Sequence, residues 1–309
     1  MKEDFRILCS LVNRNNKIYF KDKLTFFLSL ITPLILVTLF LTFMRSVYTD
    51  ALLEMIPEGI DVSDRIINGF TGGWLFSSIL GVSCVTISFC SNMIIATDKM
   101  NKNILDFNIT PVKQYLINIS YFISNFIVTF IVCAICMVAS FVYLAIVGWY
   151  ISALDIFMIL LTVIIYTLFG SMFSTIICSL LTTQGGVSAV STLVSSMYGF
   201  LCGAYMPISQ FSDGIKYFVS FIPGTYGTVL FRQFYMRGTM SELANKGVPN
   251  EVINIAKDEF DANFYFFGNK VQTYQMFLVL IVTTIVLFGV YMLMMYRKSK
   301  ANKKQERKS

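Results

Sequence analysis

The stretch QYLINISYFISNFIVTFIVCAICMVASFVYLAIVGWYISAL, residues 114–154, decides the fold because it contains no charged residue. A helix of roughly 20 apolar residues spans the hydrocarbon core of a bilayer, and this run is about twice as long. Trp149 and Tyr150 indicate a membrane interface near its end. The run is continuous rather than alternating in polarity, which is typical of a transmembrane helix and not of a barrel strand.

The rest of the chain extends this pattern. Hydrophobic residues make up 56%, charged residues only 14%, and the mean hydropathy is +0.68, whereas soluble domains carry about 25% charged residues. A turn cluster at 182–186 divides the uncharged run from Ile156 to Ser212. We therefore expect an all-α integral membrane protein with six transmembrane helices. Their ranges are 24–46, 73–97, 116–148, 155–181, 187–208 and 272–296.

The region between the fifth and sixth spans, 209–271, does not read as a crossing. Tyr217–Phe231 is uncharged but is interrupted by Pro223 and Gly224, which predicts an interfacial or re-entrant element. The polar segment 236–270 predicts a small folded loop. We expect within it one short helix from Asn250 to Ala262, capped by Asn250.

The distribution of charge predicts the orientation. Segments 1–24, 98–115 and 297–309 hold 16 of the 24 Lys and Arg residues but only 6 of the 18 Asp and Glu residues. Positive residues favour the cytoplasmic side. We expect both termini in the cytoplasm of a plasma membrane protein, with 297–309 as a basic tail. The basic balance then reflects topology and contact with anionic lipid, and nucleic acid is not an expected partner.

Residues 1–23 predict an amphipathic helix before the first span. Its apolar residues recur at helical spacing and its polar residues lie opposite. The apolar set is Phe5, Leu8, Val12 and Tyr19, and the polar set is Arg6, Asn13, Arg14, Lys17 and Lys21. This helix is either an anchor in the inner interface or a lever that touches a cytoplasmic partner.

The cytoplasmic loop 98–115 begins at Asp98 and carries apolar residues. Ile104, Leu105, Phe107 and Ile109 precede Pro111, which ends the element by removing a hydrogen-bond donor. Exposed apolar residues at this place suggest a protein partner. The alternative is a loop tucked against the bundle.

Small residues form stripes at helical spacing within the spans. They include Ser77, Gly81, Cys84 and Ser88 in the second span, Gly170 and Ser174 in the fourth, and the GxxxG pair Gly199 and Gly203 in the fifth. Such stripes allow close helix packing, and a subunit-dimer seam or a substrate wall is the sharper alternative. For Asn92, Asn118 and Asn125 we expect interhelical hydrogen bonds.

The residues that several functional classes require are missing from the sequence. Within the second to fifth spans Asp155 is the single charge, which disfavours a proton-coupled carrier, a charged-filter channel and a voltage sensor. No GxxxxGK[ST] loop occurs, so ATP would be used by another chain. The chain has no histidine, so neither a hydrolytic triad nor a metal site is expected, despite the Cys133–Cys136 CxxC.

In order and spacing, three segments resemble the membrane subunit of ABC type-2 exporters. The first is Arg14–Lys23 followed by Phe26, Phe27 and Thr32-Pro33-Leu34; the second is Asp98–Val112; the third comprises Met206-Pro207-Ile208 and Phe221–Gly227. The resemblance implies that residues 1–23 are the family's connecting helix and that the loop 98–115 contains its coupling helix. It also implies two partner ATPase subunits, which bind ATP and Mg²⁺, and a second permease subunit, identical or different. This chain itself would bind no cofactor.

The resemblance also suggests where the sites lie. Residues expected to couple to the ATPase are Arg14, Lys17, Asp98, Ile104, Leu105, Phe107 and Pro111. Residues expected at the substrate cavity or dimer seam are Ser83, Thr86, Phe89, Met197, Phe200, Gly199 and Gly203. Residues expected at an outer gate are Met206, Pro207 and Pro223. The apolar walls suit an amphipathic or hydrophobic substrate such as a drug, antimicrobial peptide, toxin or lipid.

Two other classes stay open at this point. One is a non-transporting scaffold, immunity or sensor protein whose outer segment 236–270 binds a partner. The other is a passive channel, which the lack of a charged or repeated filter disfavours.

Overall fold

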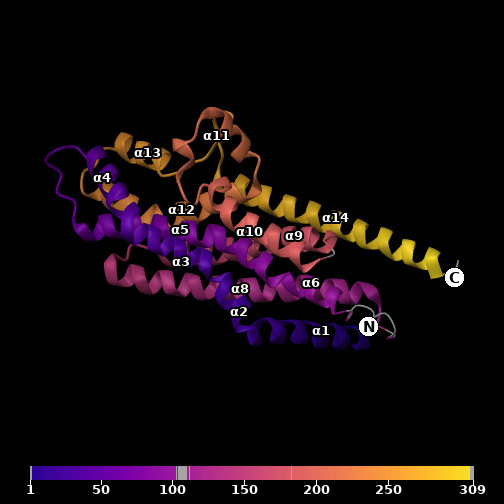
Figure 1. The fold of residues 1–309 in the computed structure, drawn as a ribbon. Coiled ribbons are helices and arrows are strands. Elements are labelled where there is room, and N and C mark those ends of the chain that lie inside the picture. Colours follow the sequence, from indigo (N-terminus) through magenta and orange to yellow (C-terminus); the bar gives the residue numbers. More distant parts are fainter. Residues whose placement is uncertain (1, 102, 104–109, 111, 182, 307–309) are drawn as a thin grey trace.

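The computed structural model describes residues 2–101, 103, 110, 112–181 and 183–306, which are almost entirely helical (Figure 1). The α-helices are α1 Lys2–Lys21, α2 Lys23–Ser29, α3 Ile31–Leu39, α4 Arg45–Met55, α5 Asp64–Ser91, α6 Met93–Met100, α8 Gln114–Val147, α9 Ala153–Leu180, α10 Gln184–Leu201, α11 Asp213–Ser220, α12 Pro223–Asn245, α13 Asn250–Glu259 and α14 Thr273–Glu306. A π-helical turn, Phe40–Met44, joins α3 to α4, and a 3₁₀ turn, Ile208–Gln210, follows α10. Strands β1 (Tyr265–Phe266) and β2 (Asn269–Lys270) form a small antiparallel hairpin.

Five helical segments among the described residues are long and apolar enough to cross a membrane. They are Lys23–Met55, Asp64–Met100, Gln114–Val147, Ala153–Leu180 and Thr273–Arg297. The all-α membrane class is therefore confirmed. The helix expected to cross at 187–208 is α10, which ends at Leu201 and is not among the five, so a sixth crossing is not confirmed.

Helix α5 is the centre of the bundle. In its span, 83% of the most hydrophobic window is buried within the chain, against 17% in α14. Small residues let its neighbours approach closely: a Cβ added to Gly170 of α9 would lie 2.3 Å from the Cys84 carbonyl oxygen. The Ser88 hydroxyl donates to the Gly170 carbonyl at 2.9 Å. These members of the small-residue stripes therefore serve helix packing.

The expected interhelical hydrogen bonds of asparagine are present for two of the three residues. The Asn92 side chain donates to Ser174 at 2.7 Å, and that of Asn125 donates to the same hydroxyl at 2.9 Å. Asn118 takes part through its backbone carbonyl, which accepts from Tyr291 at 3.2 Å. These bonds tie α5, α8 and α9 together.

The region after Pro223 differs from the expectation. The chain does break before Pro223, but from there α12 continues to Asn245, so the predicted loop boundary at Met236 is wrong. Proline is the first residue of α12, where its missing N–H costs no hydrogen bond. The helix runs antiparallel to α5, with Gly81 against Thr228 and Gly73 against Tyr235.

The short helix after α12 is shorter than expected. Helix α13 ends at Glu259 rather than Ala262, and its N-cap is Pro249, so Asn250 is its first helical residue and not its cap. Proline here has a φ of −57°, which already suits entry into a helix.

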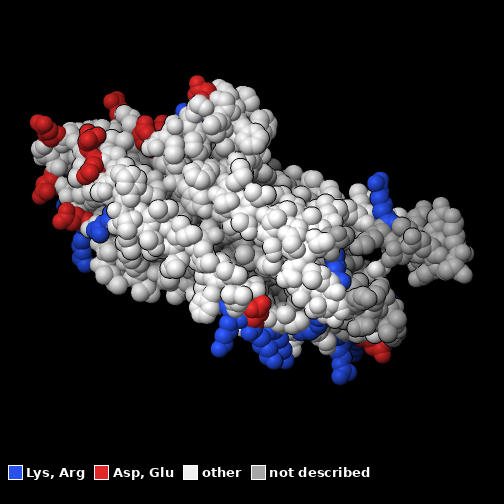
Figure 2. All heavy atoms as spheres, viewed as in Figure 1, with Lys and Arg blue, Asp and Glu red and all other residues white. Residues whose placement is uncertain are grey.

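The two poles of the molecule differ in charge (Figure 2). Acidic side chains gather around α4, α13 and the segment before α5, while basic side chains line the other end along α1. The N-terminal helix begins and α14 ends at this second pole (Figure 1). The fold therefore gathers basic residues from distant parts of the sequence at one pole and acidic residues at the other. This is the charge asymmetry on which the expected orientation depends.

Candidate functional site: a coupling node at the basic pole

Two residues assigned to ATPase coupling lie in direct contact. Arg14 of α1 donates from Nη1 to Asp98 Oδ2 at 2.6 Å and from Nη2 to Asp98 Oδ1 at 2.7 Å. This two-bond geometry is the strongest way for arginine to bind a carboxylate. The Asp98 side chain is only 3% exposed and that of Arg14 30%. The bond to Asp98 raises the pKa of the Arg14 guanidinium, so the pair stays charged.

Asp98 also accepts hydrogen bonds from two other elements. The Tyr121 hydroxyl of α8 donates to its Oδ2 at 2.6 Å, and the Asn103 side-chain amide donates to its Oδ1 at 2.8 Å. One buried carboxylate therefore joins α1, α8 and the start of the cytoplasmic loop. Sequence reasoning did not find Tyr121, because a tyrosine in an apolar helix gives no distinct signal.

Lys99, which follows Asp98 in the chain, binds a different helix, α9. The Lys99 ammonium donates to the carbonyl oxygens of Ser179 at 3.0 Å and Leu181 at 2.5 Å, at the end of α9. A lysine at this position satisfies carbonyls that have no partner within the helix and complements the helix dipole. We call Arg14, Asp98, Lys99, Asn103 and Tyr121 the coupling node.

Helix α1 packs along the first part of α8. Asp4 pairs with Lys113 at 2.8 Å and Ser124 donates to Asn16 at 2.5 Å, so the two helices run in the same direction (Figure 1). Tyr19 is buried as expected, but Phe5 is 68% exposed. Leu8 and Val12 are half-buried, so three of the four residues of the predicted apolar face are covered as expected, and polar residues such as Asn16 add hydrogen bonds to α8.

The remaining coupling residues divide into two groups. Lys17 is exposed on α1. Ile104, Leu105, Phe107 and Pro111 lie outside the described residues, so their assignment stays a prediction.

The residues expected at a substrate cavity or dimer seam lie in different environments. Ser83, Thr86 and Phe89 of α5 are at most 1% exposed, enclosed by other helices of the same chain. Met197 and Phe200 of α10 are 56% and 52% exposed. In this arrangement only the two α10 residues reach a surface of the chain.

The GxxxG pair does not form an open helix face. A Cβ on Gly199 would lie 2.3 Å from the Tyr205 ring, which folds back over it. Gly203 lies beyond the end of α10 with a φ of +70°, a left-handed conformation that favours glycine. Both glycines therefore allow the chain to reverse after α10, and their place at a cavity or dimer seam stays a prediction.

The expected outer-gate residues border the α10–α12 connection. Met206 is half-buried and Pro207 buried just before the 3₁₀ turn, and half-buried Pro223 begins α12. The two ends of this connection meet: the Thr225 hydroxyl donates to the Leu201 carbonyl at 3.3 Å. The structure thus brings these segments near each other without testing a gate.

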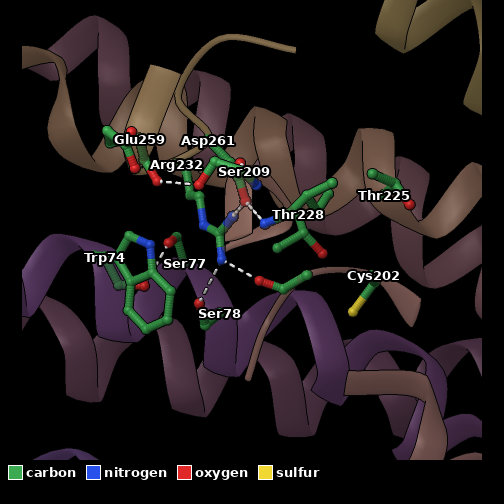
Figure 3. A network of polar contacts seen from close by, with 12 residues as sticks. Trp74, Ser77, Ser78, Cys202, Ser209, Thr225, Thr228, Arg232, Glu259 and Asp261 are labelled. Atoms are coloured by element: carbon green, nitrogen blue, oxygen red, sulfur yellow. Dashed lines mark hydrogen bonds and ion pairs between the residues drawn. The ribbon is translucent and has the colours of Figure 1, made fainter. Parts of the chain in front are cut away.

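A buried ion pair lies near this connection and was not foreseen. Arg232 of α12 is 0% exposed and donates from Nη1 to Asp261 at 2.8 Å. Its Nη2 donates to Ser78 of α5 at 3.3 Å and to the Gly203 carbonyl, and its guanidinium lies 4.8 Å from the Trp74 ring (Figure 3). Arg232 therefore links α12, α5 and the connection after α10.

Asp261 completes this arrangement from the segment after α13. It accepts the backbone N–H groups of Ile208 at 2.5 Å and Ser209 at 3.1 Å (Figure 3). Burial raises the pKa of its carboxyl, while Arg232 and the two N–H groups act in the opposite direction. The usable sequence signal was Arg232, the arginine that directly follows the uncharged run 217–231.

The geometry describes a helical membrane protein with a polar node at its basic pole, and comparison with known families specifies the class. The model of the ABC-2 type transporter family matches residues 6–236, about three quarters of the chain. The chain belongs to this family. The match covers the whole coupling node and the helices α5, α6, α8, α9 and α10. No individual curated protein matches the chain.

Membership settles the coarse function. Chains of this family form the membrane subunit of an ABC transporter, which is not itself catalytic. The resemblance found in the sequence is thereby confirmed.

Proposed function

We propose that the chain is one half of the membrane domain of an ATP-driven exporter, and that separate ATPase subunits dock at its basic pole. The observation that carries the proposal is the bidentate pair of Arg14 and Asp98. It joins α1 to the start of the cytoplasmic loop, which is the part of the chain that a docked ATPase would contact and displace. Through Tyr121 and Lys99 the same junction reaches α8 and α9.

The complex would contain two ATPase subunits that bind ATP and Mg²⁺, and a second permease subunit, identical or different. Closure of the ATPases would move the coupling node and shift the dimer from an inward to an outward opening. The charge asymmetry supports cytoplasmic termini in the plasma membrane, because basic residues favour that side. The exposed apolar residues of α10, Met197 and Phe200, suit a hydrophobic or amphipathic substrate.

The test uses the chain purified with the ATPase encoded beside it and reconstituted in lipid nanodiscs. ATP hydrolysis should depend on the permease, and Arg14→Gln should lower this permease-dependent rate about tenfold or more, since a charge-assisted two-bond contact is lost. Lys246→Gln is the control, because it removes an exposed lysine charge outside the residues expected to couple to the ATPase.

Two results would oppose the proposal. One is an isolated chain that transports at full rate without an ATPase. The other is a complex in which Arg14→Gln and Leu105→Asp leave hydrolysis and transport intact. The second result favours the alternative of a scaffold, immunity or sensor protein that binds a partner through its outer segment.

A further inference from the structure

A cavity of about 420 Å³ lies between α12, α13 and the start of α14, at the acidic pole far from the coupling node. Its floor is formed by buried apolar side chains, among them Met236, Met240 and Ile253. Its volume falls in the range of small-molecule sites, which combine an apolar lining with a few converging polar groups. The cavity can therefore hold the apolar body of a small ligand.

The rim of the cavity is cationic. Arg237 and Lys257 line it, and no Asp or Glu does. The half-buried Lys257 ammonium forms no ion pair or hydrogen bond within the described residues. Arg237 uses its Nη2 for Asp155 at 2.8 Å and Ser152 at 3.3 Å, which leaves its other N–H groups as donors. Arginine and lysine together suit a carboxylate or phosphate.

This local charge contrasts with its surroundings. Glu242, Glu251, Asp258 and Glu259 lie on the same pole but outside the lining, where all but the half-buried Glu242 are exposed. An acidic surface disfavours anions in general. An unpaired lysine at the mouth of an apolar cavity is therefore the feature that would select an anionic head group.

The cavity is also attached to the buried ion pair. Its lining includes Gln233, which follows Arg232 on α12, and Ala262, which follows Asp261. The two walls of the cavity are thus the two elements that the Arg232–Asp261 pair holds together. A ligand in the cavity would contact the residues next to both members of the pair, and the Arg232 guanidinium in turn lies 4.8 Å from the Trp74 ring.

We propose that this cavity is a binding site for a small amphipathic anion, with the head group at Lys257 and Arg237 and the tail on the methionine floor, and that occupancy shifts the Arg232–Asp261 pair. The head group is a carboxylate or phosphate, carried either by a free molecule or by a membrane lipid. The proposal does not depend on the chain being an exporter, because it concerns binding alone.

Decanoate is the probe. Calorimetry in phosphatidylcholine nanodiscs should give saturable binding, with decanol and decyltrimethylammonium about tenfold weaker or more, the difference that one charge-assisted contact makes. Lys257→Gln should weaken decanoate binding by a similar factor, and Lys246→Gln, an exposed residue outside the lining, should not. Ala244→Phe places a ring at the exposed mouth and should abolish binding without disturbing the core.

The effect of ligand binding on the Arg232–Asp261 pair is measured separately, by the fluorescence of Trp74. The chain has two tryptophans, so Trp149→Phe leaves Trp74 as the single reporter. Decanoate should shift Trp74 emission in this variant with the same midpoint as binding, and Ala244→Phe should remove the shift. Nanodiscs with phosphatidylglycerol distinguish the sources: competition with decanoate supports a lipid head group, and its absence supports a free anion.

Three outcomes overturn the inference. Equal binding of decanol or decyltrimethylammonium contradicts an anion site, and unchanged affinity in both Lys257→Gln and Ala244→Phe contradicts its location. Binding without any change in Trp74 emission contradicts the link to the ion pair.

Discussion

Asp98 and Lys99 are adjacent in the chain, and their side chains hold opposite sides of the bundle. Asp98 binds Arg14 of α1 and Tyr121 of α8, whereas Lys99 donates to carbonyls at the end of α9. The end of α6 is thus fixed from both sides. We therefore expect a displacement applied there to reach α1, α8 and α9 together.

Removing the charge of Lys99 should loosen the end of α9. In Lys99→Met the apolar stem stays but the carbonyls of Ser179 and Leu181 lose their donor. We expect a loss of about 1 kcal/mol in unfolding free energy, the scale of a cation at a helix C-terminus. Hydrogen exchange should be faster in the last turn of α9, with the exposed Lys17→Met as control. Unchanged protection there would contradict the capping role.

Breaking the buried pair at the acidic pole should be more severe. Arg232→Met leaves the Asp261 carboxylate buried without its cation, which costs about 3–5 kcal/mol in comparable sites. Thermal unfolding in detergent should show a large loss, whereas Arg65→Met, an exposed arginine at the same pole, should show little. The double variant Arg232→Met with Asp261→Asn should lose less than the two single variants added together. Additive losses would mean that the two side chains do not stabilise each other.

The difference between the two polar sites explains what could be predicted from the sequence. Arg14 and Asp98 were found because each lies in a segment of recognisable pattern, and the structure brings them into contact. Arg232 and Asp261 are separated by a helix and a turn, and no pattern marks which carboxylate a buried arginine selects. The five long apolar segments were predictable for the same reason as the first pair, since length and polarity alone define them.

The errors have a common physical origin in tertiary context. Pro223 begins a helix that packs on α5 and continues to Asn245, so the polar segment from Met236 onward starts as helix and not as loop. Gly199 and Gly203 have the spacing of a helix–helix seam, and that spacing does not show that α10 ends before the second glycine. Ser83, Thr86 and Phe89 could not be assigned to a face, because α5 is surrounded on nearly all sides.

A pair of glycine variants tests how closely α9 approaches α5. Gly170→Ala would place a methyl group 2.3 Å from the Cys84 carbonyl oxygen, so one backbone must shift. Overpacking of this kind costs about 1–3 kcal/mol. Gly289→Ala on α14 meets nothing within 4 Å and should be neutral or stabilising by up to about 1 kcal/mol. The unfolding midpoint of Gly170→Ala should therefore fall while that of Gly289→Ala stays the same or rises, and equal midpoints would refute the close approach.

Cross-linking tests whether α10 forms the contact with a second permease subunit. Met197 is exposed beside Thr192 and Ser196, and small hydroxyl side chains on an exposed helix face allow a second helix to approach closely. In a Cys9→Ser background, Met197→Cys should give a disulfide-linked dimer under mild oxidation. Ser83→Cys should not, because Ser83 is 0% exposed.

A third variant provides the matched control for this experiment. Leu278→Cys on α14 has the same exposure as Met197, 57% against 56%, but its exposed neighbours Ile281 and Val282 are apolar. It should therefore face lipid and remain uncross-linked. A dimer formed through Leu278→Cys and not through Met197→Cys would place the subunit contact on α14 instead, and α10 would then be left with lipid or substrate as its neighbour.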